Sequence, residues 1–115
     1  MGISTHILDT SLGRPAANVS VKLSEFRDDI SGGTWHKIGS DCTDRDGRCK
    51  TLLGDHSLVA TDYKIRFDVG TYFDDLHIST LYPYVEIVFR ITDPSQHYHI
   101  PLLLTANGYT TYRGS

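Results

Sequence analysis

The chain has 115 residues, the size of one ordinary domain with a single modest core. We therefore expect one domain over residues 1–115. Fourteen acidic residues against eleven basic ones give a formal charge of −3, which excludes the strongly basic surface that binds nucleic acid. Apolar runs such as Leu102–Leu104 are far shorter than the ~20 residues of a membrane span, so we expect no membrane partner.

The N-terminus predicts an intracellular protein, and that location bears on the state of the cysteines. Residues 1–6 have neither the basic start nor the apolar stretch of a secretory signal. We expect a cytoplasmic protein, with the peroxisome as the alternative although the chain has no Ser-Lys-Leu ending. Cys42 and Cys49 flank a turn and could face each other across a hairpin, but an intracellular location favours free thiols.

Apolar residues recur at every second position along the chain, which is typical of β-strands. Tyr63, Ile65 and Phe67 are one example of this alternation. Turn residues such as Asp46-Gly47 and Asn107-Gly108 separate the alternating segments. In chain order, we expect strands near residues 4–9, 18–27, 34–42, 48–52, 62–70, 84–93, 97–105 and 108–114.

One segment is long and irregular enough to hold a short helix, and it covers residues 72–81. The eight short strands leave no room between them for the crossover connections that parallel neighbours need. The sequence therefore predicts an all-β fold: an eight-stranded antiparallel β-sandwich of two sheets, with one short helix.

Histidines in the predicted strands are the first candidates for chemistry. His97 and His99 lie two residues apart, so both side chains leave the same face of their strand, opposite a mostly apolar face that we expect in the core. His6 lies in the first predicted strand, with Ser4 and Leu8 on its own side. The plain alternative for each histidine is a solvated surface residue.

Two arginines add positive charge to this set. Arg48 follows the Asp46-Gly47 turn at the start of a predicted strand, and Arg113 lies two residues before the end of the chain as given. The plain alternatives are a turn-flanking charge for Arg48 and a frayed end for Arg113.

The sequence disfavours three common kinds of site. Three imidazoles could bind zinc, but no acidic or thiol ligand has matching spacing, and Arg48 and Arg113 would repel a cation if they share the pocket. We therefore expect no metal. The chain also lacks both the Gly-x-Ser-x-Gly elbow of serine hydrolases and a glycine-rich phosphate loop.

Several segments together resemble a known family. They are Ser4–Asp9 with Gly13–Ala16, Thr43–Arg48, His97–Leu104 and Tyr109–Ser115. In this order, and over the whole chain, they are similar to the 5-hydroxyisourate hydrolases, which are related to the transthyretins. The terminal Tyr-Arg-Gly-Ser is the specific part, because it separates the hydrolases from the transthyretins that carry hormones.

The resemblance implies an assembly and a set of site residues. It implies a homotetramer, a dimer of dimers, in which the first, fourth, seventh and eighth strands share a sheet that lines a channel between dimers. The catalytic residues carried over by position are His6, Arg48 and His99. The substrate-binding residues carried over are Tyr112, Arg113, Gly114, Ser115 and, in a supporting role, His97.

The reaction implied by the resemblance is hydrolysis of 5-hydroxyisourate to 2-oxo-4-hydroxy-4-carboxy-5-ureidoimidazoline, without a cofactor. Ring opening needs a base for water, positive charge for the oxyanion and an acid for the leaving nitrogen. Two histidines and an arginine supply all three, and either histidine could be the base. Two alternatives stay open: a carrier that binds a small aromatic ligand without chemistry, and a metal-dependent hydrolase.

Overall fold

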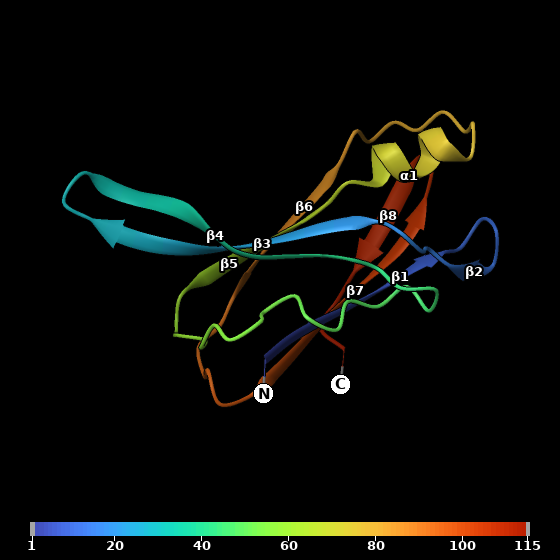
Figure 1. Cartoon of the computed structure of the whole chain (residues 1–115). Helices are drawn as coiled ribbons and strands as arrows, with labels where there is room; N and C mark the ends of the chain where they lie inside the picture. The colour runs from blue at the N-terminus through green and yellow to red at the C-terminus, as the bar shows by residue number, and fades with distance from the viewer. Residues whose placement is uncertain (1, 115) are drawn as a thin grey trace.

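Two four-stranded sheets pack face to face in this protein (Figure 1). The structure is a computed structural model and describes residues 2–114. The first sheet has the order β2-β1-β7-β8, formed by β1 (Gly2–Asp9), β2 (Arg14–Pro15), β7 (His97–Thr105) and β8 (Gly108–Thr111). The second has the order β4-β3-β5-β6, formed by β3 (Ser20–Asp29), β4 (Gly32–Cys42), β5 (Asp62–Phe67) and β6 (Val85–Arg90). With the short helix α1 (Val69–Asp75), they confirm the predicted all-β sandwich.

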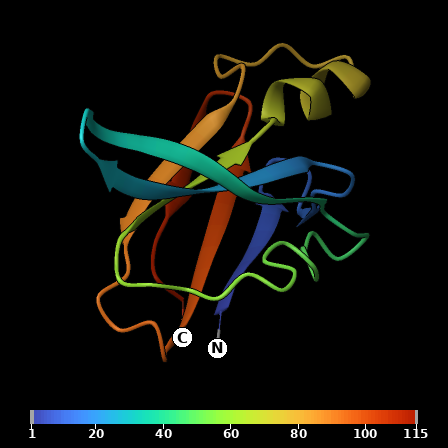
Figure 2. The same cartoon turned by 60° about the vertical axis from the view of Figure 1, so that its left-hand side comes forward.

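One strand pair departs from the predicted antiparallel arrangement. β1 and β7 run parallel, from Gly2 beside His97 to Asp9 beside Leu104, and they lie side by side in Figure 2. The prediction of a wholly antiparallel sandwich is therefore wrong for this pair. The whole second sheet lies between β1 and β7 in the sequence, so the long connection that a parallel pair needs is present after all.

The fourth predicted strand, at residues 48–52, is not a strand. Arg48 forms a single antiparallel bridge with His6, and residues 49–61 follow an irregular path. Cys49 and Leu52 are the buried side chains at the start of this path. Because they lie three residues apart, the period of two that a strand requires is broken here.

The helix begins and ends earlier than predicted. Val69 and Phe73 lie four residues apart and are both fully buried, so Val69, which the alternation assigned to the preceding strand, belongs to a helical face. After the helix, His77 takes a left-handed φ of 57°, which breaks the helical path before the predicted end at residue 81. The two-residue strand β2 was not predicted, and it pairs with the end of β1.

The predicted core faces of the long strands are confirmed. Leu23 on β3, Ile65 on β5 and Leu102 on β7 are fully buried between the sheets. On β1, Ser4 and His6 are only half-buried, because they lie on the face that points away from the second sheet. The outer face of the first sheet therefore carries the predicted site residues of β1.

Both cysteines are free thiols, as expected, with Cys42 exposed and Cys49 buried. Burial raises the pKa of the Cys49 thiol to about 12. Among residues 2–114, no helix has the length and the apolar character that crossing a membrane requires.

Candidate active site

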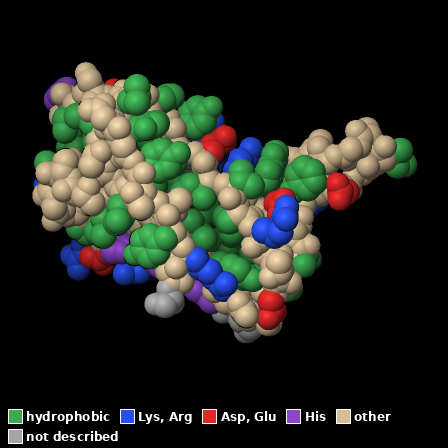
Figure 3. All heavy atoms as spheres, turned by 180° about the vertical axis from the view of Figure 1, so that it is seen from behind, with side chains coloured by type: hydrophobic (Ala, Val, Ile, Leu, Met, Phe, Trp, Pro, Cys, Tyr) green, Lys and Arg blue, Asp and Glu red, His purple; other side chains and the backbone are tan. Residues whose placement is uncertain are grey.

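The outer face of β1 and β7 gathers the three predicted histidines. His6 lies on β1, His97 and His99 lie on β7, and the strand register sets Ser4 beside His99. Alternate residues of a strand share a face, so these four side chains point away from the core together. Figure 3 shows histidine side chains next to Lys and Arg side chains along the lower edge of the molecule.

The Ser4 hydroxyl joins two of these histidines. Its Oγ lies 2.8 Å from Nδ1 of His99 and 2.7 Å from Nε2 of His97. A hydroxyl has one proton to donate, so at least one of the two imidazoles donates an N–H to Oγ. Nδ1 of His99 is thereby engaged, and Nε2 is the nitrogen that has no hydrogen-bond partner among residues 2–114.

Arg48 reaches the same face through the turn that precedes it. The Asp44 carboxylate accepts a hydrogen bond from the amide of Arg48 at 3.1 Å, and the Gly47 carbonyl accepts one from the amide of Ile7 at 2.9 Å. Gly47 has a φ of +76°, which favours glycine, and a side chain there would collide with the Ile7 carbonyl. The turn is thus fastened to β1 and holds Arg48 opposite His6.

The surroundings of His99 disfavour its protonated form. Burial is the strongest influence on its pKa, and the charge of Arg48 and the nearby imidazoles of His6 and His97 act in the same direction. Together they hold the pKa of His99 below its usual value of 6.5. His99 is therefore neutral at physiological pH and able to accept a proton.

The C-terminal segment meets this face at Gly114. Its amide donates a hydrogen bond to the carbonyl of His99 at 2.8 Å, which makes an isolated antiparallel bridge. The imidazole lies so close that a Cβ built on Gly114 would be 2.5 Å from Cδ2 of His99. This part of the segment is ordered against β7 instead of frayed. Ser115, the last predicted site residue, lies outside the described residues.

The side chains of Arg113 and Tyr112 contact residues other than the catalytic candidates of their own chain. The Arg113 guanidinium donates to the Gln96 side chain at 2.9 Å and lies over the ring of Tyr98, 4.3 Å from its centroid. Tyr112 is 54% exposed and, with Arg113, lines a pocket of about 320 Å³ beside β6. These two predicted substrate-binding side chains therefore do not join the catalytic candidates of their own chain.

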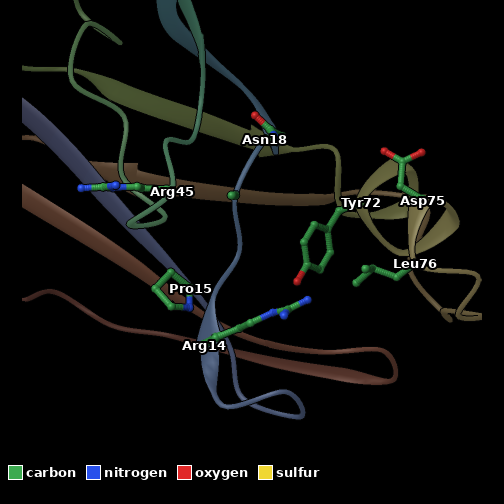
Figure 4. Close-up of a pocket in the computed structure, with 8 residues that line it drawn as sticks. Arg14, Pro15, Asn18, Arg45, Tyr72, Asp75 and Leu76 are labelled. Atoms are coloured by element: carbon green, nitrogen blue, oxygen red, sulfur yellow. The ribbon is translucent and has the colours of Figure 1, made fainter.

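Two surface pockets lie beside the first sheet. A pocket of about 530 Å³ lies between β2 and α1, where Arg14 and Tyr72 extend into the same space (Figure 4). The Tyr72 hydroxyl donates to the buried Asp9 carboxylate at 2.7 Å, which ties α1 to the end of β1.

A second pocket, of about 490 Å³, has Ser4 and His97 among its lining residues. Neither this pocket nor the one beside α1 contains His6, Arg48 or His99. Arg48 is exposed on the outer sheet face, and both histidines are half-buried there.

The cluster offers acid–base chemistry next to a fixed positive charge. A neutral imidazole can accept a proton, a second imidazole can donate one, and the guanidinium can stabilise an anionic oxygen. Among residues 2–114, no group of three or more His, Cys, Asp and Glu side chains is arranged to hold a metal ion.

Ser4 is the member of the cluster whose role the sequence did not reveal. Alternation placed it on the face of His6, but its two hydrogen-bond partners lie 93 and 95 residues later in the chain. Only the register between β1 and β7 brings them together, and no pattern within either segment encodes that register.

Comparisons with known proteins agree with this fold and with the resemblance of the motifs. The model of the HIUase/Transthyretin family matches residues 3–114. The 5-hydroxyisourate hydrolase of Salmonella typhimurium is 39% identical over 113 residues, which cover 98% of this chain and 80% of that protein.

Two solved structures are similar over almost the whole chain. The 5-hydroxyisourate hydrolase of Klebsiella pneumoniae has a TM-score of 0.82 and 31% identity, covering 98% of this chain and 97% of that one. Sea bream transthyretin in complex with thyroxine has a TM-score of 0.87 and 28% identity, covering 97% of this chain and 93% of that one. The names of the curated relatives confirm the predicted enzyme class, a hydrolase. The chain belongs to the HIUase/Transthyretin family.

Proposed function

We propose that this protein hydrolyses 5-hydroxyisourate and opens its six-membered ring to give 2-oxo-4-hydroxy-4-carboxy-5-ureidoimidazoline. The observation that carries the proposal is the meeting of His6, Arg48 and His99 on one sheet face, against which Gly114 of the Tyr-Arg-Gly-Ser segment is bonded. Relatives that bear the name of this activity match nearly the whole chain, which supports the choice of substrate.

His99 is the proposed general base. Its lowered pKa keeps it neutral, and its bond to Ser4 leaves Nε2 for the attacking water. His6 then orients the water or protonates the departing ring nitrogen. Arg48, which is always charged and has several fixed donors, binds substrate oxygens and stabilises the oxyanion.

The protein is proposed to work as a homotetramer, a dimer of dimers. Arg48 is exposed in one chain, and Tyr112 and Arg113 of that chain line a pocket beside β6, which supports a substrate pocket completed by a second copy. Native mass spectrometry tests this assembly. A stable monomer with full activity would contradict a pocket shared between copies.

The direct test is to generate 5-hydroxyisourate from urate with urate oxidase and to follow its decay with and without catalytic amounts of the protein. Acceleration that survives a chelator supports a metal-independent hydrolase. Acceleration lost on chelation and restored by added metal supports the metal-dependent alternative. Absence of acceleration, together with thyroxine binding in calorimetry, would replace the proposal with a carrier.

The acid limb of the pH profile, where kcat/KM falls as the pH is lowered, is expected to lie below pH 6.5, the usual pKa of a histidine. As the pH falls through the lowered pKa of His99, the base becomes protonated and kcat/KM is lost, whereas above that pKa the base is neutral and the rate is retained. Initial rates across the acidic range measure this limb. A limb above pH 6.5 would show that a different group is the base.

Alanine in place of Gly114 is expected to lower kcat/KM about tenfold to a hundredfold, because its Cβ would push the His99 ring away from its working position. Steady-state rates and the melting temperature are measured together. The matched control is Gly108→Ala in β8, where the nearest atom to the new Cβ is Thr105 Oγ1 at 3.6 Å, an ordinary contact. Equal rates in the two variants would contradict tight packing at Gly114.

A further inference from the structure

The Ser4 hydroxyl connects the half-buried imidazole of His99 with the exposed imidazole of His97. Both hydrogen bonds of Ser4, at 2.8 Å to His99 and 2.7 Å to His97, have the lengths of well-formed bonds. The parallel ladder holds Ser4 beside His99 and Gly2 beside His97, so backbone pairing fixes the position of the hydroxyl relative to the two rings. A chain of three exchangeable groups therefore runs from the proposed base to the surface.

We propose that Ser4 and His97 are positioning residues that form a proton relay with His99. The relay rests on the proposed hydrolysis, in which Nε2 of His99 takes a proton from water. In the starting arrangement, Nδ1–H of His99 donates to Oγ of Ser4, and the Ser4 hydroxyl donates to Nε2 of His97. The neutral His97 ring keeps its own proton on Nδ1.

The proton balance closes over one turnover. When Nε2 of His99 binds the proton of water, Nδ1 passes its proton to Oγ of Ser4 as Oγ passes its own to Nε2 of His97. The N–H bond of His99 and the O–H bond of Ser4 break, a new O–H and a new N–H form, and the positive charge moves to His97. The relay runs backwards when Nε2 of His99 gives its proton to the leaving ring nitrogen, which restores the starting arrangement.

The electrostatic surroundings favour moving the positive charge from His99 to His97. His99 is half-buried and faces Arg48 and His6, so a positive charge on its ring is disfavoured. His97 is exposed, and water stabilises its charged form. The Arg113 guanidinium donates to the His97 backbone carbonyl at 3.4 Å, and Lys50 and Asp55 line the same pocket as His97. All three charged side chains are exposed, so solvent screens them.

The test compares four variants by steady-state kinetics on 5-hydroxyisourate. Ser4→Ala is expected to lower kcat at least about tenfold, the value of one hydrogen bond to the reacting group, with KM nearly unchanged. Ser4→Thr keeps the hydroxyl and is expected to recover most of that loss. His97→Gln is also expected to lower kcat, whereas the double variant Ser4→Ala with His97→Gln is expected to be no slower than Ser4→Ala alone, because His97 acts only through Ser4.

A titration of His99 by NMR distinguishes the relay from a merely structural role of Ser4. A merely structural role would leave the pKa of His99 unchanged. The bond from Nδ1–H to Ser4 stabilises the protonated ring, so Ser4→Ala is expected to lower the pKa of His99, and Ser4→Thr to leave it near the wild-type value. Losses that multiply in the double variant, or a Thr variant as slow as the Ala variant, would overturn the relay alone. A wild-type protein without turnover would overturn the proposed function and the relay with it.

Discussion

Asparagine in place of His99 is expected to lower kcat/KM for 5-hydroxyisourate at least about a hundredfold, because the variant has no base to activate water. The amide of asparagine fits the half-buried position and can still bond to Ser4, so the fold is expected to survive. His6→Asn is expected to cause a loss of the same order, since it removes the second imidazole of the cluster. Steady-state rates measured beside melting temperatures separate lost chemistry from lost structure.

The matched control is His36→Asn, the same change on the other sheet. His36 is exposed on β4, in the hairpin that projects from the sandwich (Figure 1), and its ring bonds only to Thr34 among the described residues. Its rate is expected to equal that of the wild type. A folded His99 or His6 variant that loses less than about tenfold would remove that histidine from the proposed mechanism.

Glutamine in place of Arg48 is expected to lower kcat/KM about a hundredfold to a thousandfold, the value of one donor to an oxyanion. Arg48→Lys keeps the charge but loses the fork of parallel donors, so its loss is expected to be smaller. Arg48→Gln also removes a charge that lowers the pKa of His99, and the acid limb of its pH profile is therefore expected to move to higher pH.

The two Arg48 variants divide the role of this residue into charge and geometry. If Arg48→Lys is as slow as Arg48→Gln, the geometry of the parallel guanidinium donors contributes more to the rate than the positive charge does. If the acid limb of Arg48→Gln stays where it is in the wild type, Arg48 does not act on the group that titrates, and His99 would not be that group.

The strands and their core faces were predictable because alternation is a local property. Ile65 and Leu102 each lie in a run of period two, and each is fully buried between the sheets. Prediction failed where the local period changes inside a segment. Cys49 and Leu52 bury side chains three residues apart, and Val69 and Phe73 bury theirs four apart, so the strand expected at 48–52 is absent and the helix begins before residue 72.

The grouping of the candidate residues was predictable, and their detailed contacts were less so. His6, Arg48 and His99 lie near one another on the outer face, as the resemblance implied, and alternation explains why the two histidines share that face. The sequence did not reveal the bridging role of Ser4, or the turn of Arg113 toward Tyr98, since both depend on which distant residues become neighbours.

The parallel pairing of β1 and β7 also sets the order in which a growing chain can fold. Thr5 bonds to Ile100, 95 residues away, so β1 leaves the ribosome long before its partner strand exists. The local pairs, β3 with β4 and β5 with β6, can close earlier because little loop entropy opposes them. The histidine face is thus completed only after β7 has been synthesised, and a nascent chain arrested before that strand lacks both His97 and His99.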